Sequence, residues 1–310
     1  MKMLSKEEDN LYSATGNVFL VLINTKLPSK MAAINMCKAK IVDKVLPETS
    51  DKVPPETMAG ADGIVHLIDR NEKGQETTWN VKIINSDGSD GGFSGNGLRC
   101  AALCLFHKNS SRKTIKFSIK EQIVTATIDE ENIVSLIFSN PWFKILKLTT
   151  LMKNSSFKKL LNVPALSLTC INVGNPHLII NTLKHKVYYT DEIKENLDKL
   201  RLNGNLTKEG LNVSIITKER DRWNIKTFER GVGETPGCGS AALAAFISLR
   251  CINITSSHHK NENDIALSFA SKGGILKLFK KNNTIVLRGN VKKLFNDTSI
   301  MSHNVSRTHE

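Results

Sequence analysis

WNVK at residues 79–82 recurs as WNIK at residues 223–226, and this repeat decides the fold that the sequence predicts. The offset is 144 residues, and at the same offset SGN at residues 94–96 lies over CGS at residues 238–240. After these glycines, each half continues into a small, apolar segment, at residues 98–106 and 241–249. Each half therefore has the order strand, glycine-rich turn and apolar helix, which indicates two domains related by internal pseudo-symmetry.

The two apolar segments carry almost no charge, Arg99 aside, and a helix that is apolar all round is buried. Most other apolar runs have strand length and are rich in β-branched residues, with further helical patterns near residues 30–40, 148–161 and 191–200. We therefore predict an α+β fold of two pseudo-symmetric β-rich domains, each wrapped around one central apolar helix. The expected domains are residues 11–145 and 146–296, with flexible tails at residues 1–10 and 297–310.

Composition excludes several classes of protein. The chain has 310 residues, 40% of them hydrophobic and 24% charged, which is typical of globular domains. The net charge of +13 is dispersed along the chain with few aromatic residues, so we expect a solvated basic surface and no nucleic-acid partner. The chain contains no run of 18 apolar residues, so no membrane partner is expected. Residues 1–13 lack the apolar core of a signal peptide, so a cytoplasmic location is expected.

The six cysteines predict free thiols, because no CxxC pair or secretory context accompanies them. Cys100 and Cys104 lie four residues apart on the first apolar helix, but no His or acidic residue at ligand spacing joins them. Two buried thiols are therefore favoured, and no metal site is expected.

The glycine-rich turns at residues 85–100 and 229–240 are the candidate functional segments. Each presents free backbone N–H groups at a helix N-terminus, which suits a carboxylate or phosphate. Gly231 and Gly233 begin a G-x-G-x-x-G pattern, but Pro236 occupies the position of the third glycine. Nucleotide binding is therefore disfavoured.

Cys238 is the most reactive candidate in these turns. A thiol at a helix N-terminus has a lowered pKa, which suits a nucleophile or general base, whereas the alternative is a buried, inert cysteine. Ser94 occupies the equivalent position, where it either caps the helix or acts as a much weaker base. The GNPH sequence at residues 174–177 is either a plain turn or part of the site. Asn17 and Asn212 lie in predicted strands, where asparagine is disfavoured, so each is an edge residue or faces a ligand.

These residues together resemble the diaminopimelate epimerase family, in the cofactor-independent amino-acid racemase group. The family signature N-x-D-G-S-x4-C-G-N-[GA]-x-R is matched over residues 85–99, apart from its cysteine. The second signature, E-R-G-x-G-E-T-x-x-C-G-[ST], is matched over residues 229–240. The family's GNPH and early G-N-x-F motifs correspond to residues 174–177 and 16–19, so the matches extend over nearly the whole chain.

The resemblance implies two similar domains with the active site in the cleft between them, and a homodimer. It implies interconversion of LL- and meso-diaminopimelate by proton removal and redelivery at the α-carbon, a step of lysine and peptidoglycan precursor synthesis, without metal or other cofactor. It implies Cys238 as one acid/base and Ser94 at the position of the other, and His177 near the cleft with its role left open. The residues it implies for substrate binding are Asn17, Asn85, Gly95, Asn96, Asn175, Asn212, Glu229, Arg230, Gly239 and Ser240.

Ser94 departs from the family pattern, which has a cysteine at this position. Inversion by two bases needs two groups of comparable proton affinity, and a Ser/Cys pair does not provide them. Four alternatives stay open: a slow epimerase, an engineered inactive form, a one-base dehydratase or racemase of another amino acid, and a catalytically impaired homologue that binds an amino acid.

Overall fold

A computed structural model describes residues 10–39, 42–43, 58–70, 77–120, 122–139, 144–146, 165–182, 191–202, 210–230, 232–254, 266–281 and 283–294. The helices are α1 Lys30–Ala39, α2 Gly95–Lys108, α4 Asp191–Arg201 and α5 Gly239–Ile254. The strands of the first half are β1 Leu11–Ala14, β2 Asn17–Ile23, β3 Val42–Asp43, β4 Met58–Ala59, β5 Gly63–Arg70, β6 Thr78–Asn85, β7 Thr114–Ile119, β8 Gln122–Ile128, β9 Ile133–Ser139 and β10 Lys144–Leu146. Those of the second half are β11 Ala165–Asn172, β12 Pro176–Thr182, β13 Asn212–Glu219, β14 Arg222–Glu229, β15 Gly233–Thr235, β16 Ala266–Ser271, β17 Gly274–Lys281 and β18 Thr284–Leu294.

The two halves repeat one strand topology. From β1 to β9, through β2, β5, β6, β7 and β8, successive pairs are antiparallel, parallel, antiparallel, parallel, antiparallel and antiparallel. From β11 to β18, through β12, β13, β14, β16 and β17, the sequence of pairings is the same. The repeated WNVK and WNIK segments lie on the equivalent strands β6 and β14. The pseudo-symmetry inferred from one tetrapeptide therefore extends over the whole sheet.

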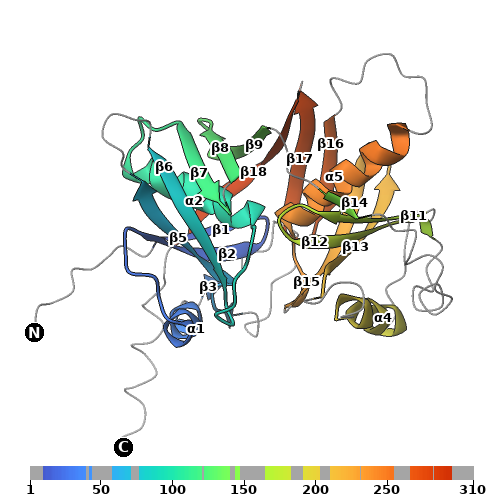
Figure 1. Cartoon of the computed structure of the whole chain (residues 1–310), viewed down its shortest axis with the longest axis horizontal. Helices are drawn as coiled ribbons and strands as arrows, with labels where there is room; N and C mark the ends of the chain where they lie inside the picture. The colour runs from blue at the N-terminus through green and yellow to red at the C-terminus, as the bar shows by residue number, and fades with distance from the viewer. Residues whose placement is uncertain are drawn as a thin grey trace, which may run out of the picture.

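Strand β18 joins the two halves. It pairs with β17 of its own half, and with β9 and β1 of the first half. The pairing of β18 with β1 closes an eight-stranded barrel of β1, β2, β5, β6, β7, β8, β9 and β18. Figure 1 shows β18 and β17 at the junction between the two lobes. The chain's last described strand thus completes the barrel that its first strand begins.

Helices α2 and α5 occupy the centres of the two halves (Figure 1). In α2, all residues from 95 to 105 are buried, including the charged Arg99, and in α5 residues 241–246 have no exposed surface. The absence of a polar face therefore has a structural reason, because strands surround each helix. The amphipathic helices α1 and α4 instead pack on the outside, where Ala33 and Leu197 contribute to small separate clusters.

The predicted fold class is confirmed: two similar β-rich halves each surround one apolar helix. Five of the six cysteines have described side chains, and all five are free thiols. The helix expected near residues 148–161 and the tails at residues 1–9 and 297–310 lie outside the described residues. The domain bounds 11–145 and 146–296 stay a prediction. Within the described part of the chain, the helices are too short or too polar to cross a membrane.

The N-termini of α2 and α5 meet between the two halves. Gly95 and Gly239 are their first residues, and a Cβ built on Gly239 would lie 3.2 Å from the Cα of Gly95 and 2.9 Å from Oδ1 of Asn96. A Cβ on Gly95 would lie no closer than 3.5 Å to Gly239. The contact therefore requires glycine on α5 and tolerates a small side chain on α2.

This asymmetry predicts different costs for two matched substitutions. Gly239→Ala should lower the free energy of unfolding by about 1–3 kcal/mol, because its methyl group overlaps Asn96 and the end of α2. Gly95→Ala should change it by less than about 1 kcal/mol, since alanine there meets only ordinary contacts and favours helix. Urea denaturation of both variants measures the difference, and equal costs would show that the two ends are not in tight contact.

Candidate active site

Ser94 and Cys238 stand at the two meeting helix ends. Ser94 is the N-cap of α2, and its Oγ accepts a hydrogen bond from the N–H of Gly97 at 3.0 Å. Cys238 precedes α5, and its backbone oxygen accepts the N–H of Ala242 at 3.1 Å. Both side chains line one cavity of about 70 Å³. The two positions matched by the internal repeat thus face a common space, with backbone N–H groups of both helices around it.

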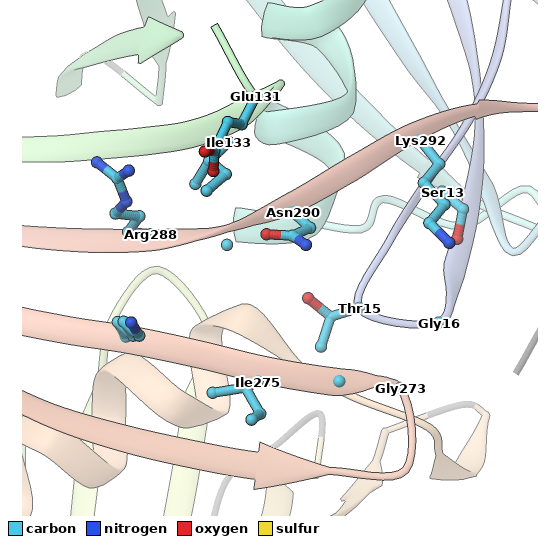
Figure 2. Close-up of a pocket in the computed structure, with 13 residues that line it drawn as sticks. Ser13, Thr15, Gly16, Glu131, Ile133, Gly273, Ile275, Arg288, Asn290 and Lys292 are labelled. Carbon is cyan, nitrogen blue, oxygen red and sulfur yellow. The ribbon is translucent and has the colours of Figure 1, made fainter. Parts of the chain in front are cut away.

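A second, larger cavity of about 640 Å³ lies elsewhere, between β17, β18 and the β1–β2 turn. Figure 2 shows its walls, with Arg288 and Asn290 on β18 and Thr15 in the turn. It contains none of the residues that the sequence predicts for the site. The smaller cavity is therefore the candidate active site, since the chemistry-bearing side chains gather there.

Asn96 and Asn17 form the floor of the smaller cavity. The Nδ2 of Asn96 donates to Oδ1 of Asn17 at 2.6 Å and to the backbone oxygen of Gly237 at 3.1 Å. Both asparagines are buried, and both line the cavity. This pair links α2 and β2 of the first half to the turn that carries Cys238.

Glu229, at the end of β14, is the acidic neighbour of Cys238. Its Oε1 accepts a hydrogen bond from the hydroxyl of Thr235 at 2.6 Å, and its carboxylate hydrogen-bonds the Cys238 thiol. Burial raises the pKa of Glu229. Ser240 approaches from the other side, with its Oγ 3.2 Å from the sulfur of Cys238.

The prediction that the thiol pKa of Cys238 is lowered is wrong. The helix N-terminus predicts a lowered thiol pKa, but burial and the negative charge of Glu229 raise the pKa of Cys238 well above its usual value. Only 7% of the residue is exposed, so the charged thiolate loses most of its hydration. At neutral pH the resting form of Cys238 is therefore the thiol, which is a proton donor.

Asn175 and Asn85 line the side of the cavity formed by the first glycine-rich turn. The Nδ2 of Asn175 donates to the backbone oxygen of Phe93 at 2.8 Å, so a turn of the second half holds the residue before Ser94. Asn85, at the end of β6, donates from Nδ2 to Oγ of Ser89 at 2.9 Å. The GNPH segment is thus more than a plain turn, because it fixes the position of the opposite half.

His177, Asn212 and Arg230 form a separate group that does not line the cavity. The N–H of Arg230 donates to Oδ1 of Asn212 at 2.8 Å, which turns the amide NH₂ of Asn212 toward Nε2 of His177, 3.4 Å away. Nε2 must therefore accept, and the proton lies on Nδ1. Burial lowers the pKa of His177 to about 3, so the ring is neutral. Here His177 orients Asn212, which in turn anchors the backbone of Arg230.

Nine of the predicted site residues line the cavity: Asn17, Asn85, Ser94, Asn96, Asn175, Glu229, Cys238, Gly239 and Ser240. Gly95 contacts Gly239 at its edge, whereas Asn212, Arg230 and His177 lie outside its lining. Sequence reasoning missed Thr235 and Asp62, which also line it. Thr235 belongs to the second signature and was detectable there, but no local pattern distinguishes Asp62. Among the described residues, no cluster of three His, Cys, Asp or Glu side chains could hold a metal ion.

The chain is similar in sequence to known epimerases. No family model matches the chain. A diaminopimelate epimerase of Buchnera aphidicola is 34% identical over 178 residues, which are 54% of this chain and 60% of that protein. One of Listeria innocua is 29% identical over 240 residues, which are 73% of this chain and 69% of that protein. The matched part thus spans about 60% of the length of the first curated relatives.

Solved structures share the fold at low sequence identity. A hydroxyproline epimerase from Agrobacterium vitis, with bound trans-4-hydroxy-L-proline, has a TM-score of 0.59 at 12% identity, covering 92% of this chain and 88% of its own. A phenazine biosynthesis protein of the PhzF family from Enterococcus faecalis has a TM-score of 0.58 at 15% identity, covering 91% of this chain and 94% of its own. The resemblance to the diaminopimelate epimerase family, predicted from the two signatures, is therefore confirmed by sequence similarity, and the fold agrees with it.

Proposed function

We propose that this chain is a cofactor-independent amino-acid epimerase that interconverts LL- and meso-diaminopimelate. One observation carries the proposal: Ser94 and Cys238 lie at two helix N-termini that meet, and both line a single cavity. An α-carbon held between them has one acid/base group on each face. Inversion of a stereocentre by proton removal and redelivery requires this placement.

The surroundings of the cavity suit the reacting end of an amino acid. The helix ends supply N–H groups and positive dipole potential for the α-carboxylate, and for the charge that develops when the α-proton leaves. The buried carboxylate of Glu229 suits the α-ammonium group, and the amide NH₂ of Asn17 supplies a further hydrogen bond. We assign the distal carboxylate to Arg230, whose backbone Asn212 holds.

The size of the cavity implies movement on binding. A volume of about 70 Å³ is well below the ~300 Å³ lower end of small-molecule sites. Only the reacting centre fits into it, so we infer that substrate enters when the turns around residues 85–97 and 232–238 move apart. Closure then excludes water from the α-carbon. A homodimer is the assembly that the resemblance implies, and it stays a prediction.

A second candidate follows from the role of the Ser94 hydroxyl. Its Oγ already accepts the N–H of Gly97 as a helix cap, and a serine hydroxyl is a far weaker base than a thiolate. With Cys238 as the one strong acid/base, the same cavity could eliminate water from a 3-hydroxylated amino acid, or bind an amino acid without turnover. The first experiment below separates these functions.

We expect the chain to exchange the α-proton of diaminopimelate slowly, and Ser94→Cys to accelerate it by about 10²–10⁴-fold, because the thiol restores a matched pair. Cys238→Ala should abolish exchange. NMR in D₂O, with LL- and meso-diaminopimelate offered separately, measures exchange and inversion together.

Each other outcome of this experiment selects a different function. Exchange with retention, from one isomer only, would assign one-base chemistry to Cys238. Absence of exchange in all variants, Ser94→Cys included, would contradict the epimerase and direct the search to a 3-hydroxylated substrate or to binding alone.

The raised pKa of Cys238 predicts the pH dependence of its reactivity. Because the thiolate is the reactive form, alkylation by iodoacetamide should continue to accelerate above pH 9, beyond the usual thiol pKa. Glu229→Gln removes the neighbouring negative charge, so it should shift the Cys238 profile to lower pH. Peptide mass spectrometry reports each thiol separately.

Cys104 is the internal control, since burial without Glu229 raises its pKa to about 11. Its profile should be the same in both proteins. A Cys238 profile that stays in place, or shifts to higher pH in Glu229→Gln, would show that Glu229 does not set the thiol pKa.

A further inference from the structure

Arg99 is a buried cation that the mechanism above does not use. It lies on the second turn of α2 with no exposed surface. Within the described part of the chain, no carboxylate acts on its charge, and its Nε has no hydrogen-bond partner. Burial lowers its pKa to about 10, which still leaves the guanidinium charged at neutral pH. A buried charge without a counter-ion is costly, so its retention needs an explanation beyond packing.

Three neutral oxygens from three segments accept hydrogen bonds from the guanidinium. Nη2 donates to Oδ1 of Asn96 at 2.6 Å and to Oγ1 of Thr15 at 2.6 Å. Nη1 donates to the backbone oxygen of Asn290 on β18 at 3.2 Å. One side chain therefore joins the central helix, the β1–β2 turn and the strand that unites the two halves.

The bond to Asn96 fixes the direction of the amides in the cavity floor. Because a guanidinium can only donate, the oxygen of Asn96 must face Arg99, and its NH₂ must face Asn17 and Gly237. The Asn96 NH₂ donates a hydrogen bond to the side-chain oxygen of Asn17. The NH₂ of Asn17 is therefore available as a donor to a ligand in the cavity that Asn17 lines. The backbone oxygen of Gly237 can only accept and favours the same orientation, so without Arg99 the direction of both amides would depend on that one bond of 3.1 Å. A half-turn of both amides would make Asn17 present an acceptor to a substrate carboxylate.

The bond to Thr15 acts on the turn that carries Cys238. Thr15 has φ of 51°, an unfavourable backbone conformation for a β-branched residue. A Cβ on Gly237 would lie 2.7 Å from the backbone oxygen of Thr15, so the strained turn packs directly against the residue before Cys238. The bond from Asn96 to the oxygen of Gly237 reaches the same residue. Two separate routes thus lead from Arg99 to Cys238.

We propose that Arg99 is a positioning residue of the catalytic cavity, which orients the Asn17 amide as a donor to the substrate α-carboxylate and holds the Gly237–Cys238 turn against α2. The carboxylate part of this assignment rests on the proposed function, whereas the part that concerns Cys238 does not. The cation also places a fixed positive charge behind the subsite where negative charge develops in the reaction.

The larger cavity gives access to the space that Arg99 fills. Thr15 and Asn290, two of its partners, lie on the wall of that cavity, as Figure 2 shows. Gly289 lines it as well, and a Cβ there would lie 2.5 Å from Nη1 of Arg99. A small cation added in solution can therefore reach the space left by a deleted guanidinium through this cavity, without passing through the cavity that Cys238 lines.

Arg99→Met tests the proposal on the whole chain. Alkylation of Cys238 should become at least about tenfold faster, and calorimetry should show at least about tenfold weaker binding of diaminopimelate. Methylguanidinium should reverse both changes. Arg99→Lys should have an alkylation rate and a binding affinity between those of the wild-type chain and Arg99→Met. Its ammonium group keeps the charge but cannot hold Asn96 and Thr15 in the same fork geometry.

Arg288→Met is the matched control. It removes a different arginine, on β18, which lines the larger cavity and pairs with Asp129 at 2.5 Å. It should leave the alkylation rate of Cys238 unchanged, with or without methylguanidinium. Cys100 and Cys104, on the same helix as Arg99, report general loosening of the fold.

Two results would overturn the proposal. One is an equal rise in alkylation of Cys100, Cys104 and Cys238 in Arg99→Lys and Arg99→Met, without rescue, which would mean that Arg99 only supports the fold. The other is an unchanged Cys238 rate in both variants. Failure of the wild-type chain to bind diaminopimelate would contradict the proposed function alone, because the alkylation of Cys238 still decides the role of Arg99.

Discussion

The contact between the N-termini of α2 and α5 is the constraint on which the other features depend. The two helix ends can approach this closely because Gly239, the first residue of α5, lacks a side chain, and because Gly95 on α2 has at most room for a small one. The approach brings two sets of free N–H groups to one point, which favours an anion there. It also brings Ser94 and Cys238, from two different helix ends, to one shared cavity. The strands of both halves then serve to hold the two helices end to end, and their pairing follows the same order in each half.

Much of the fold could be predicted because the sequence repeats it. One conserved spacing between the halves, together with two segments apolar on every side, is enough to indicate two central helices within strands. The pairing of β18 with strands of both halves could not be predicted. Its residues read as an ordinary strand, and only the three-dimensional path shows that it pairs with β9 and β1 as well as β17. Non-local pairing leaves no local pattern in a single sequence.

The candidate site could be predicted for a similar reason. The prediction was wrong where residues distant in sequence determine the property of a group. The glycine-rich turns indicate residues such as Asn96 and Gly239 directly. The pKa of Cys238 was predicted in the wrong direction, because the helix N-terminus is a local feature whereas burial and the charge of Glu229 come from tertiary structure. Likewise, Asn212 holds the backbone of Arg230 instead of lining the cavity, and only the position of His177 beside it explains this.

The path of β18 has a consequence for the order in which the protein forms as it is synthesised. The first barrel needs β18 beside both β9 and β1, yet residues 284–294 are synthesised after all the other described strands of both halves. The N-terminal half therefore emerges with the edges of β1 and β9 unpaired while the C-terminal half is being made. Closure of the first barrel and completion of the second half become one late event. The common N-terminal-first order of domain folding does not apply here, and the two halves gain their final stability together.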